Sequence, residues 1–384
     1  MMKVLLLWLS CVFTRALEEQ TCLLSNDGSC LPEDLPPIVD EYIDVGFGDR
    51  QQVTGSQETI DATMKQIHEM VRYMQGTVMK DPSFEEIKNE CANRNELCAY
   101  WASVGECEAN PKYMKVTCAP ACLTCDHLKF ETRCPIDEEY LKEGIWGPGD
   151  LDKMFRRIVN DYENVTVMSS PEMRLETYAY DNPPWVVVVD DFLTDEECQA
   201  LIDLGAARGY ERSKDVGTRK FDGTYGSVES TGRTSSNAWC VDECYDDPVA
   251  KQVIDKLEKL TGIPDANAEY LQMLKYEVSQ RYESHHDYII FHNRRAQGVR
   301  ILTAFLYLND VEEGGGTHFN TLDLTCMPKK GRVLLWASVK NDKPHEKDRR
   351  TMHEALPVLK GIKYGANAWF HQRDFKAPFA NNCI

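Results

Sequence analysis

Residues 271–288 read LQMLKYEVSQRYESHHDY, and this stretch decides the fold of the C-terminal half of the chain. It contains the strand-like run LQMLKYEV and the start of a second run, ESHHDYI, with polar residues between them. Three further runs follow, ILTAFLYLN, GRVLLWAS and YGANAWFHQ, separated by Gly, Asn, Asp and Pro. Several short strands joined by such turns predict a mainly β domain built as a double-sheet jelly roll.

A flanking helix is expected upstream of these strands. It follows the β-branched run at residues 186–189, which is suited to a buried strand. Thr194 is a good N-cap because Glu197 stands three residues later. Apolar residues within 198–206 give the helix one buried face. We therefore expect a folded domain that begins at about Pro183.

The histidine pair in the opening stretch raises the question of which ring takes part in chemistry. A strand directs alternate side chains to opposite faces, so His285 and Asp287 share a face while His286 points away. Two imidazoles and one carboxylate on one side of a metal are typical of non-haem Fe(II) sites. The pair alone is weak evidence, because surface strands often carry such residues. The candidates for a third ligand are His292, His318, His345, His353 and His371.

Lys363 changes this assessment, since it follows His353 by ten positions. A lysine inside a protein and near a metal can neutralise the distal carboxylate of a cosubstrate. Residues 352–363 can form a strand, a turn at Lys360-Gly361 and the start of a second strand. We therefore expect His353 and Lys363 to face each other across a hairpin.

Four ordered blocks cover about residues 183–377. They are VVDDFLTDEECQALI, GRTSSNAWC, the opening stretch with RILTAFLYLNDVEEGGGTHF after it, and RTMHEALPVLKGIKYGANAWFH. Together they resemble the catalytic domain of prolyl 4-hydroxylases, especially those of plants and algae. That family consists of Fe(II)- and 2-oxoglutarate-dependent dioxygenases on a double-stranded β-helix. The resemblance implies hydroxylation of peptidyl proline to 4-hydroxyproline, with O2 and L-ascorbate as further requirements.

The resemblance also assigns roles to individual residues. It implies that His285, Asp287 and His353 bind iron, and that Lys363 holds the C5 carboxylate of 2-oxoglutarate. The positions that it places in or near the cosubstrate pocket are Tyr276, Tyr282 and Thr317. The positions that it places in contact with the substrate peptide are Arg300, Trp369 and His371. Ser279, His318 and Asn320 depart from the family pattern, so the preferred peptide is not predicted.

Six cysteines lie within the stretch CANRNELCAYWASVGECEANPKYMKVTCAPACLTC. So short a segment cannot be stabilised by apolar burial alone, and crosslinks are expected. Zinc binding is the weaker interpretation in a protein with a secretory leader. The stretch resembles the ShK toxin-like (ShKT) domain in WA, GEC and NP elements at the expected places. The pairings that the resemblance implies are Cys91 with Cys125, Cys98 with Cys118, and Cys107 with Cys122.

The remaining sequence suggests a modular chain. The expected parts are a signal peptide at 1–16, an acidic segment and amphipathic helix at 17–88, the ShKT domain at 89–126, a connector at 127–182 and the dioxygenase domain at 183–377. Cleavage of the leader would remove Cys11 and leave an even number of cysteines, which fits an oxidising compartment. A location in the lumen of the endoplasmic reticulum or Golgi is predicted, with secretion as the alternative.

The formal charge of −19 argues against nucleic acid or an anionic membrane surface as a main partner. Membrane association is expected only if the leader is retained. The predicted partner is a proline-rich peptide or protein, and the oligomeric state is not predicted. Two other functions remain open: a dioxygenase that modifies another residue such as lysine, and an inactive binding protein that uses the ShKT module.

Overall fold

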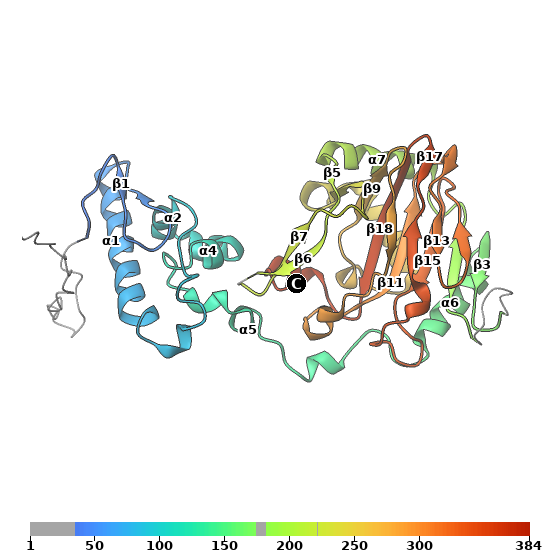
Figure 1. Ribbon diagram of the computed structural model, residues 1–384, viewed down its shortest axis with the longest axis horizontal. Helices are drawn as coiled ribbons and strands as arrows, with labels where there is room; N and C mark the ends of the chain where they lie inside the picture. The colour runs from blue at the N-terminus through green and yellow to red at the C-terminus, as the bar shows by residue number, and fades with distance from the viewer. Residues whose placement is uncertain (1–34, 174–181, 221) are drawn as a thin grey trace, which may run out of the picture. The chain divides into compact units, whose positions relative to one another are not determined.

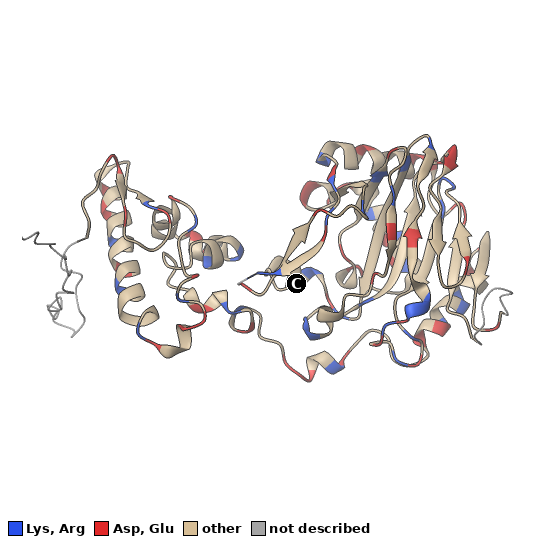
Figure 2. Cartoon of the chain, viewed as in Figure 1, with Lys and Arg blue, Asp and Glu red and all other residues tan. Residues whose placement is uncertain are grey.

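The computed structural model describes residues 35–173, 182–220 and 222–384. The chain divides into two compact units, and the boundary falls between Cys125 and Asp126 (Figure 1). The predicted leader at residues 1–16 lies outside the described residues, and so do Cys22 and Cys30 in the segment that follows it. Asp and Glu, which outnumber Lys and Arg by 62 to 43, occur in both units (Figure 2). Within the described part of the chain, no helix is long and apolar enough to cross a membrane.

The first unit is small and mostly helical. Its elements are β1 (Tyr42–Ile43), β2 (Gln51–Gln52), α1 (Gln57–Tyr73), η1 (Met74–Val78), η2 (Pro82–Phe84), α2 (Cys98–Ser103), α3 (Glu106–Ala109) and α4 (Pro111–Thr117). Ser56 caps α1 by accepting a hydrogen bond from the backbone N–H of Thr59. The predicted amphipathic helix is present as α1, whose buried face includes Ile67, Met70 and Val71. Residues 42–52, within the segment expected to be acidic, also form the β1–β2 pair, which the sequence pattern did not indicate.

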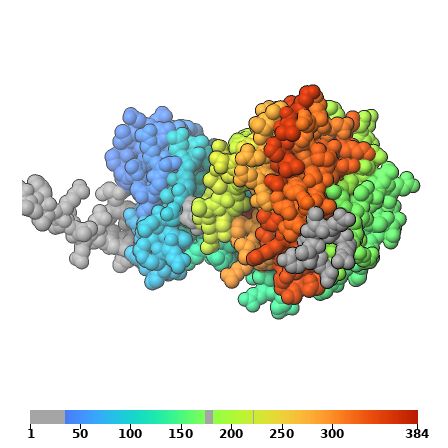
Figure 3. All heavy atoms as spheres, turned by 45° about the vertical axis from the view of Figure 1, so that its right-hand side comes forward, coloured from blue at the N-terminus to red at the C-terminus, as the bar shows by residue number. Residues whose placement is uncertain are grey.

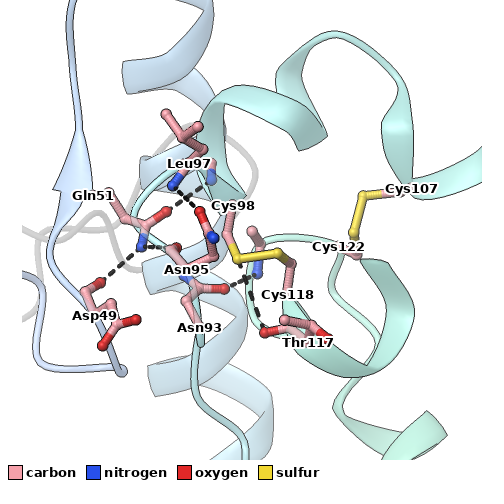
Figure 4. The surroundings of a disulfide bond; sticks show 12 residues. Asp49, Gln51, Asn93, Asn95, Leu97, Cys98, Cys107, Thr117, Cys118 and Cys122 are labelled. Atoms are coloured by element: carbon pink, nitrogen blue, oxygen red, sulfur yellow. Dashed lines mark hydrogen bonds between the residues drawn. A yellow bond between two sulfur atoms is a disulfide. The ribbon is translucent and has the colours of Figure 1, made fainter. Parts of the chain in front are cut away.

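Three disulfides link the cysteine-rich stretch of this unit: Cys91–Cys125, Cys98–Cys118 and Cys107–Cys122. These are the pairings that the resemblance implies. Gln51 ties the β1–β2 pair to this stretch (Figure 4). Its amide donates to the carbonyl oxygens of Asp49 and Asn95 at 2.7 and 3.1 Å, and its side-chain oxygen accepts from the N–H of Ala99 at 2.8 Å. A buried side chain with all these partners fixes the register of the chain around the crosslinks.

The second unit is built on an eight-stranded antiparallel sheet. In spatial order its strands are β3 (Val165–Ser169), β4 (Val186–Val189), β15 (Val333–Ala337), β11 (Arg300–Tyr307), β18 (Lys363–His371), β9 (Gln272–Tyr276), β8 (Ser236–Trp239) and β5 (Glu211–Arg212). The central strand β11 is buried on both faces. Ala304 and Leu306 belong to the core on one side, whereas Phe305 and Tyr307 belong to the core on the other.

Three helices cover one face of this sheet: α6 (Asp150–Asp161), α7 (Asp195–Arg208) and α8 (Pro248–Thr261). The predicted cap of α7 is present, since Thr194 and Glu197 form a reciprocal capping box. Asp247 caps α8, whose first residue is Pro248, and Gly262 ends it with a φ of 72°. In the space-filling view, the C-terminal strands (orange to red) lie beside the green part of this unit (Figure 3).

The other face packs against a four-stranded sheet of β10 (Tyr282–His285), β16 (His353–Ala355), β13 (Thr317–Phe319) and β14 (Leu324–Cys326). Two smaller pairs, β6 (Asp215–Arg219) with β7 (Tyr225–Val228) and β12 (Glu313–Gly314) with β17 (Val358–Lys360), complete the strands. Two facing antiparallel sheets with helices outside confirm the predicted jelly roll.

The cysteines of the second unit form two disulfides. Cys240 pairs with Cys244, and Cys134 pairs with Cys383 across 249 positions of sequence. Cys198 and Cys326 are buried free thiols. Cys134–Cys383 joins the helix α5 (Phe130–Arg133) to the C-terminal end, beyond helix α9 (Lys376–Ala380). The chain after the ShKT-like region is therefore anchored covalently to the last residues of the protein.

Candidate active site

The three expected ligand residues converge between the two sheets. His285 ends β10, Asp287 follows just beyond that strand, and His353 begins β16. His285 and His353 are partners in the β10–β16 register. Nε2 of His285 lies 4.0 Å from Oδ1 of Asp287, and Nε2 of His353 lies 3.7 Å from its Oδ2. Among the described residues this is the one group of His, Cys, Asp and Glu close enough to hold a metal ion, with ligand atoms within 4.8 Å of one another.

Hydrogen bonds at the far side of each ring turn these residues toward a common point. Nδ1 of His285 lies 2.8 Å from the carbonyl oxygen of Glu283, and Nδ1 of His353 lies 3.0 Å from that of Thr351. A carbonyl accepts, so each Nδ1 carries the proton and each Nε2 presents a lone pair. The hydroxyl of Thr303, on β11, donates to Oδ2 of Asp287 at 2.7 Å. Such partners are typical of metal ligands.

The protonation states also suit metal binding. Burial and the neighbouring His353 lower the pKa of His285 to about 3, so its ring is neutral at physiological pH. Burial alone would raise the pKa of Asp287, but His353 and His285 outweigh it and lower that pKa to about 2. A neutral imidazole and an ionised carboxylate are the forms that coordinate a cation.

His286 points away from this group and has a structural role. Its Nδ1 accepts from the backbone N–H of Tyr288 at 2.9 Å, so Nε2 carries the proton and donates to the carbonyl oxygen of Asp348 at 2.8 Å. Asp348 caps the short helix η8 (Arg349–Thr351), which leads directly into His353. His286 therefore connects the strand that carries two ligands to the segment that carries the third.

Lys363 lies in the same interior space. Its side chain is 1% exposed, and its Nζ has no hydrogen-bond partner. The rings of Phe305, Tyr276 and Tyr307 surround Nζ, with centroids 4.9, 5.1 and 5.3 Å away. Burial lowers the pKa of Lys363 to about 7. A buried ammonium group without a counter-ion is costly, and its surroundings are suited to an anionic ligand.

One cavity between the sheets connects these groups. Its lining includes His285, Asp287, His353, Lys363 and the three predicted pocket residues Tyr276, Tyr282 and Thr317. The ring of Tyr282 stacks on His285 at 3.6 Å, and its hydroxyl donates to Asp215 at 3.0 Å. The Thr317 hydroxyl hydrogen-bonds the hydroxyl of Tyr307 at 2.7 Å.

The expected hairpin between His353 and Lys363 is absent. His353 lies on β16 of the smaller sheet, whereas Lys363 begins β18 of the larger one, where it pairs with Tyr276. The intervening strand β17 pairs with β12 instead. The two residues nevertheless line one cavity, because the sheets on which they lie face each other.

An open cleft of about 540 Å³ leads to the ligand group from outside. Arg300 and Trp369 line this cleft, and the Arg300 guanidinium stacks on the Trp369 ring at 3.8 Å. His371 does not line it, because it is completely buried. Its Nδ1 donates to the carbonyl oxygen of Gly298 at 2.7 Å and its Nε2 to Glu269 at 2.8 Å. The expected direct contact of His371 with substrate does not fit this burial, and His371 instead binds Glu269, which in turn binds Arg300.

Glu269 organises this side of the cleft. Both of its oxygens accept from the Arg300 guanidinium, at 2.5 and 3.0 Å, while one also accepts from His371. Both ring nitrogens of His371 thus lie within hydrogen-bond distance of an oxygen atom. Burial opposes ionisation of Glu269, but Arg300 and His371 together hold its pKa below the usual range. This buried network fixes the direction in which Arg300 enters the cleft.

Comparisons with known proteins agree with this arrangement. Residues 271–371 match the profile of the 2OG-Fe(II) oxygenase superfamily, and residues 90–125 match the ShK domain-like profile. Probable prolyl 4-hydroxylase 8 of Arabidopsis thaliana is 37% identical over 214 residues, which cover 50% of this chain and 70% of that protein. Prolyl 4-hydroxylase 5 of the same plant is 36% identical over 213 residues, with the same shares. The chain belongs to the prolyl 4-hydroxylase family.

Two further proteins are similar to part of this chain. The prolyl 4-hydroxylase subunit alpha-1 of Rattus norvegicus is 32% identical over 245 residues, which cover 62% of this chain and 43% of that subunit. A viral collagen prolyl hydroxylase of Paramecium bursaria Chlorella virus-1, solved as its 2OG complex, has 27% sequence identity and a TM-score of 0.38. It aligns with 48% of this chain and 95% of its own.

Two residues of this prolyl 4-hydroxylase site were not predicted from the sequence. Glu269 stands before β9 in a stretch with no pattern of its own, and only the fold brings it to Arg300. Arg233 lines the cleft, stacks on Tyr282 at 4.7 Å and donates to Gln272 at 3.1 Å. It lies within the GRTSSNAWC block, so the family resemblance contained a signal for it.

Proposed function

We propose that this chain is an Fe(II)- and 2-oxoglutarate-dependent dioxygenase that hydroxylates peptidyl proline to 4-hydroxyproline. The single observation that carries the proposal is the convergence of His285, Asp287 and His353 on one point beside an unpartnered buried lysine. In the reaction, the substrate C–H and one atom of O2 give the hydroxyl group, while the other atom oxidises 2-oxoglutarate to succinate and CO2.

The residues present fit both Fe(II) and 2-oxoglutarate. His285, Asp287 and His353 offer two imidazole nitrogens and one carboxylate, which is a ligand set typical of non-haem Fe(II). Lys363 Nζ lacks a hydrogen-bond acceptor and lines the same cavity, so it would hold the distal carboxylate of 2-oxoglutarate. Bound together, the metal and the oxo acid would supply the oxidant for C–H hydroxylation.

The protein's own residues perform binding and orientation. Thr303, Glu283 and Thr351 fix the ligand side chains through the hydrogen bonds described above. Apolar and aromatic walls around Lys363 exclude water, which strengthens its attraction for a carboxylate.

The outer cleft suits an extended peptide. The indole ring of Trp369 is suited to pack on a proline ring, and the N–H groups of Arg300 are suited to donate to a backbone carbonyl oxygen. A proline-rich chain already populates the polyproline II conformation, so little entropy is lost when it docks. The three predicted pocket residues, Tyr276, Tyr282 and Thr317, complete the walls toward the cosubstrate.

The location and the remaining requirements belong to the same proposal. Ten of the described cysteines are paired in disulfides, which fits folding in an oxidising compartment such as the lumen of the endoplasmic reticulum or Golgi. O2 is the proposed co-substrate, and L-ascorbate the proposed reductant that keeps the iron in its Fe(II) state.

Mass spectrometry of reaction products tests this function. The purified full chain, supplied with Fe(II), 2-oxoglutarate, ascorbate and air, is incubated with a small panel of Pro-rich peptides. We expect a gain of one oxygen atom per modified residue, and fragmentation should locate it on proline. Oxygen on lysine would redirect the assignment to another dioxygenase class, and an unchanged panel with no succinate would contradict it.

A further inference from the structure

A second hollow adjoins the catalytic cleft and has no role in the reaction described above. Its volume is about 510 Å³. Gly226 and Ile289 line the catalytic cleft, whereas the residues next to them, Tyr225 and Ile290, line the second hollow. The two spaces are therefore neighbours along strand β7 and along the segment that follows the ligand strand.

The walls of this hollow are held in place by specific contacts. The guanidinium of Arg133 donates to the carbonyl oxygen of Asp222 at 2.8 Å, and that of Arg295 donates to the carbonyl oxygen of Gly223. Gly223 has a φ of 78°, and a Cβ there would stand 2.4 Å from the Cβ of Phe130. Only glycine permits so close an approach of the β6–β7 hairpin to α5. The Cys134–Cys383 disulfide fixes α5 in turn.

The charge of the hollow differs from that of the chain. Arg219, Arg294 and Arg295 line it together with one carboxylate, that of Glu131, although the whole chain has a formal charge of −19. Glu131 lies 3.7 Å from Arg219, and Arg294 forms no ion pair with any described residue. Nη1 of Arg295 is buried without a hydrogen-bond partner. Burial, and the nearby charge of Arg219, lower the pKa of Arg295, so an added anion would relieve this repulsion.

The apolar part of the lining indicates what kind of anion fits. Tyr225 stacks on Phe291 with centroids 3.7 Å apart, Arg295 covers the ring of Phe130 at 3.6 Å, and Ile290 is 77% exposed. Aromatic and aliphatic surface beside guanidinium groups suits a peptide that carries carboxylates. A nucleic acid is a poor match, since its phosphates would meet the negative field of the rest of the chain.

We propose that this hollow binds an acidic segment of the protein substrate, on one side of the proline that enters the cleft. The inference deepens the proposed function and rests on it for the identity of the peptide. The inference predicts that the enzyme prefers proline sites with Asp or Glu nearby. No motif in the sequence indicates this preference.

Binding and turnover of matched synthetic peptides test the proposal. Each Pro-rich peptide carries a block of glutamates, or of glutamines, before or after the target proline. When the block lies on the side of the proline that reaches the hollow, the glutamate peptide should bind more tightly than the matched glutamine peptide. We expect its Kd and KM to be about five- to tenfold lower at low ionic strength, with kcat unchanged. The difference should shrink as salt is added. The double variant Arg219→Glu, Arg294→Glu should abolish or reverse it and leave the glutamine peptides unaffected.

Lys65→Glu, Arg72→Glu is the matched control, because it makes the same charge change on exposed positions of α1. It should retain the glutamate preference. Equal affinity for glutamate and glutamine peptides, or a preference that persists in the Arg219, Arg294 variant, would overturn the inference. Kd measured on His353→Ala, which should not turn over, reports the glutamate preference independently of catalysis. A glutamate preference in Kd together with no hydroxylation of any peptide by the wild type would contradict the proposed function and leave the acidic-segment site standing.

Discussion

The two units of this chain are stabilised in different ways. The first holds three disulfides between Cys91 and Cys125, with sequence separations of 34, 20 and 15 residues. The second relies on two apolar cores, one on each face of its large sheet. Every group that we assign to catalysis lies in the second unit. We therefore expect the stability of the first unit and catalysis by the second to respond to different substitutions. The first two predictions below test this independence, and the others sharpen the account of the second unit.

The largest expected effect follows from the loss of a ligand. Asp287→Asn keeps the size of the side chain but removes the negative charge between two imidazoles. Proline hydroxylation should fall at least about a thousandfold, because the charge that holds the cation is gone. Metal analysis of the purified variant should show a matching loss of bound iron. The thermal transition of the first unit should not move, and a shift there would contradict the separation of the units.

The next effect concerns the first unit alone. Replacing both Cys107 and Cys122 by Ser removes a crosslink that spans 15 residues of sequence. This should destabilise the first unit by about 3 kcal/mol, as measured by denaturant unfolding. Turnover of a short peptide should stay within twofold of the wild type. A large loss of that activity would mean that the first unit supports the active site.

Lys363→Met should separate stability from function within the second unit. Loss of the ammonium group should raise the KM for 2-oxoglutarate about 10- to 100-fold, because a charge-assisted contact with the carboxylate disappears. The same change should raise the melting temperature of the cosubstrate-free protein, since a buried charge without a partner is removed. Unchanged KM would show that Lys363 does not hold the cosubstrate.

The pH dependence of the same lysine gives a further test. The pKa of Lys363 is about 7 in the free protein, and the cosubstrate requires the protonated form. Below pH 7 the lysine is already charged, so the KM for 2-oxoglutarate should be flat with respect to this group. Above pH 7 a proton must be taken up on binding, and KM should rise about tenfold per pH unit. Lys363→Arg should flatten that rise, because guanidinium stays charged.

The smallest effect is expected at His286. His286→Phe removes the hydrogen bond to Asp348 and should weaken iron binding about tenfold through the displaced His353 segment. His286→Gln can still donate from a similar position and should recover most of the affinity. Anaerobic titration with Fe(II) measures both values. Equal affinity in all three proteins would show that His286 does not position the site.

Much of this architecture could be predicted from local sequence patterns. Short strands with turn residues indicated the jelly roll. The alternation of side chains on a strand indicated that His285 and Asp287 act together, although β10 ends at His285 and Asp287 follows it. The partnership of His353 with Lys363 was misjudged, because the sequence cannot tell which sheet each short strand will join. Glu269 and the Cys134–Cys383 pair were beyond reach for the same reason: their partners lie far away in sequence.

The resemblance to a family located residues better than it described their contacts. It assigned His371 to the substrate, whereas that ring is buried and binds Glu269. Similarity to the family's motifs indicates that a residue lies near the cleft. Only the packed structure shows which atoms the residue contacts. The arginine-lined hollow could not be predicted from the sequence either, because its residues come from three separate segments that only the fold brings together.

The measurement that tests the central claim most directly is peptide-dependent succinate release by the wild type and by His353→Ala, with equal protein, Fe(II) and 2-oxoglutarate. We predict that adding a hydroxylatable Pro-rich peptide raises succinate formation by the wild type, and that the variant stays at background. If His353→Ala forms succinate at the wild-type rate, or if neither protein exceeds background with any peptide, the ligand group at 285, 287 and 353 is not the catalytic centre.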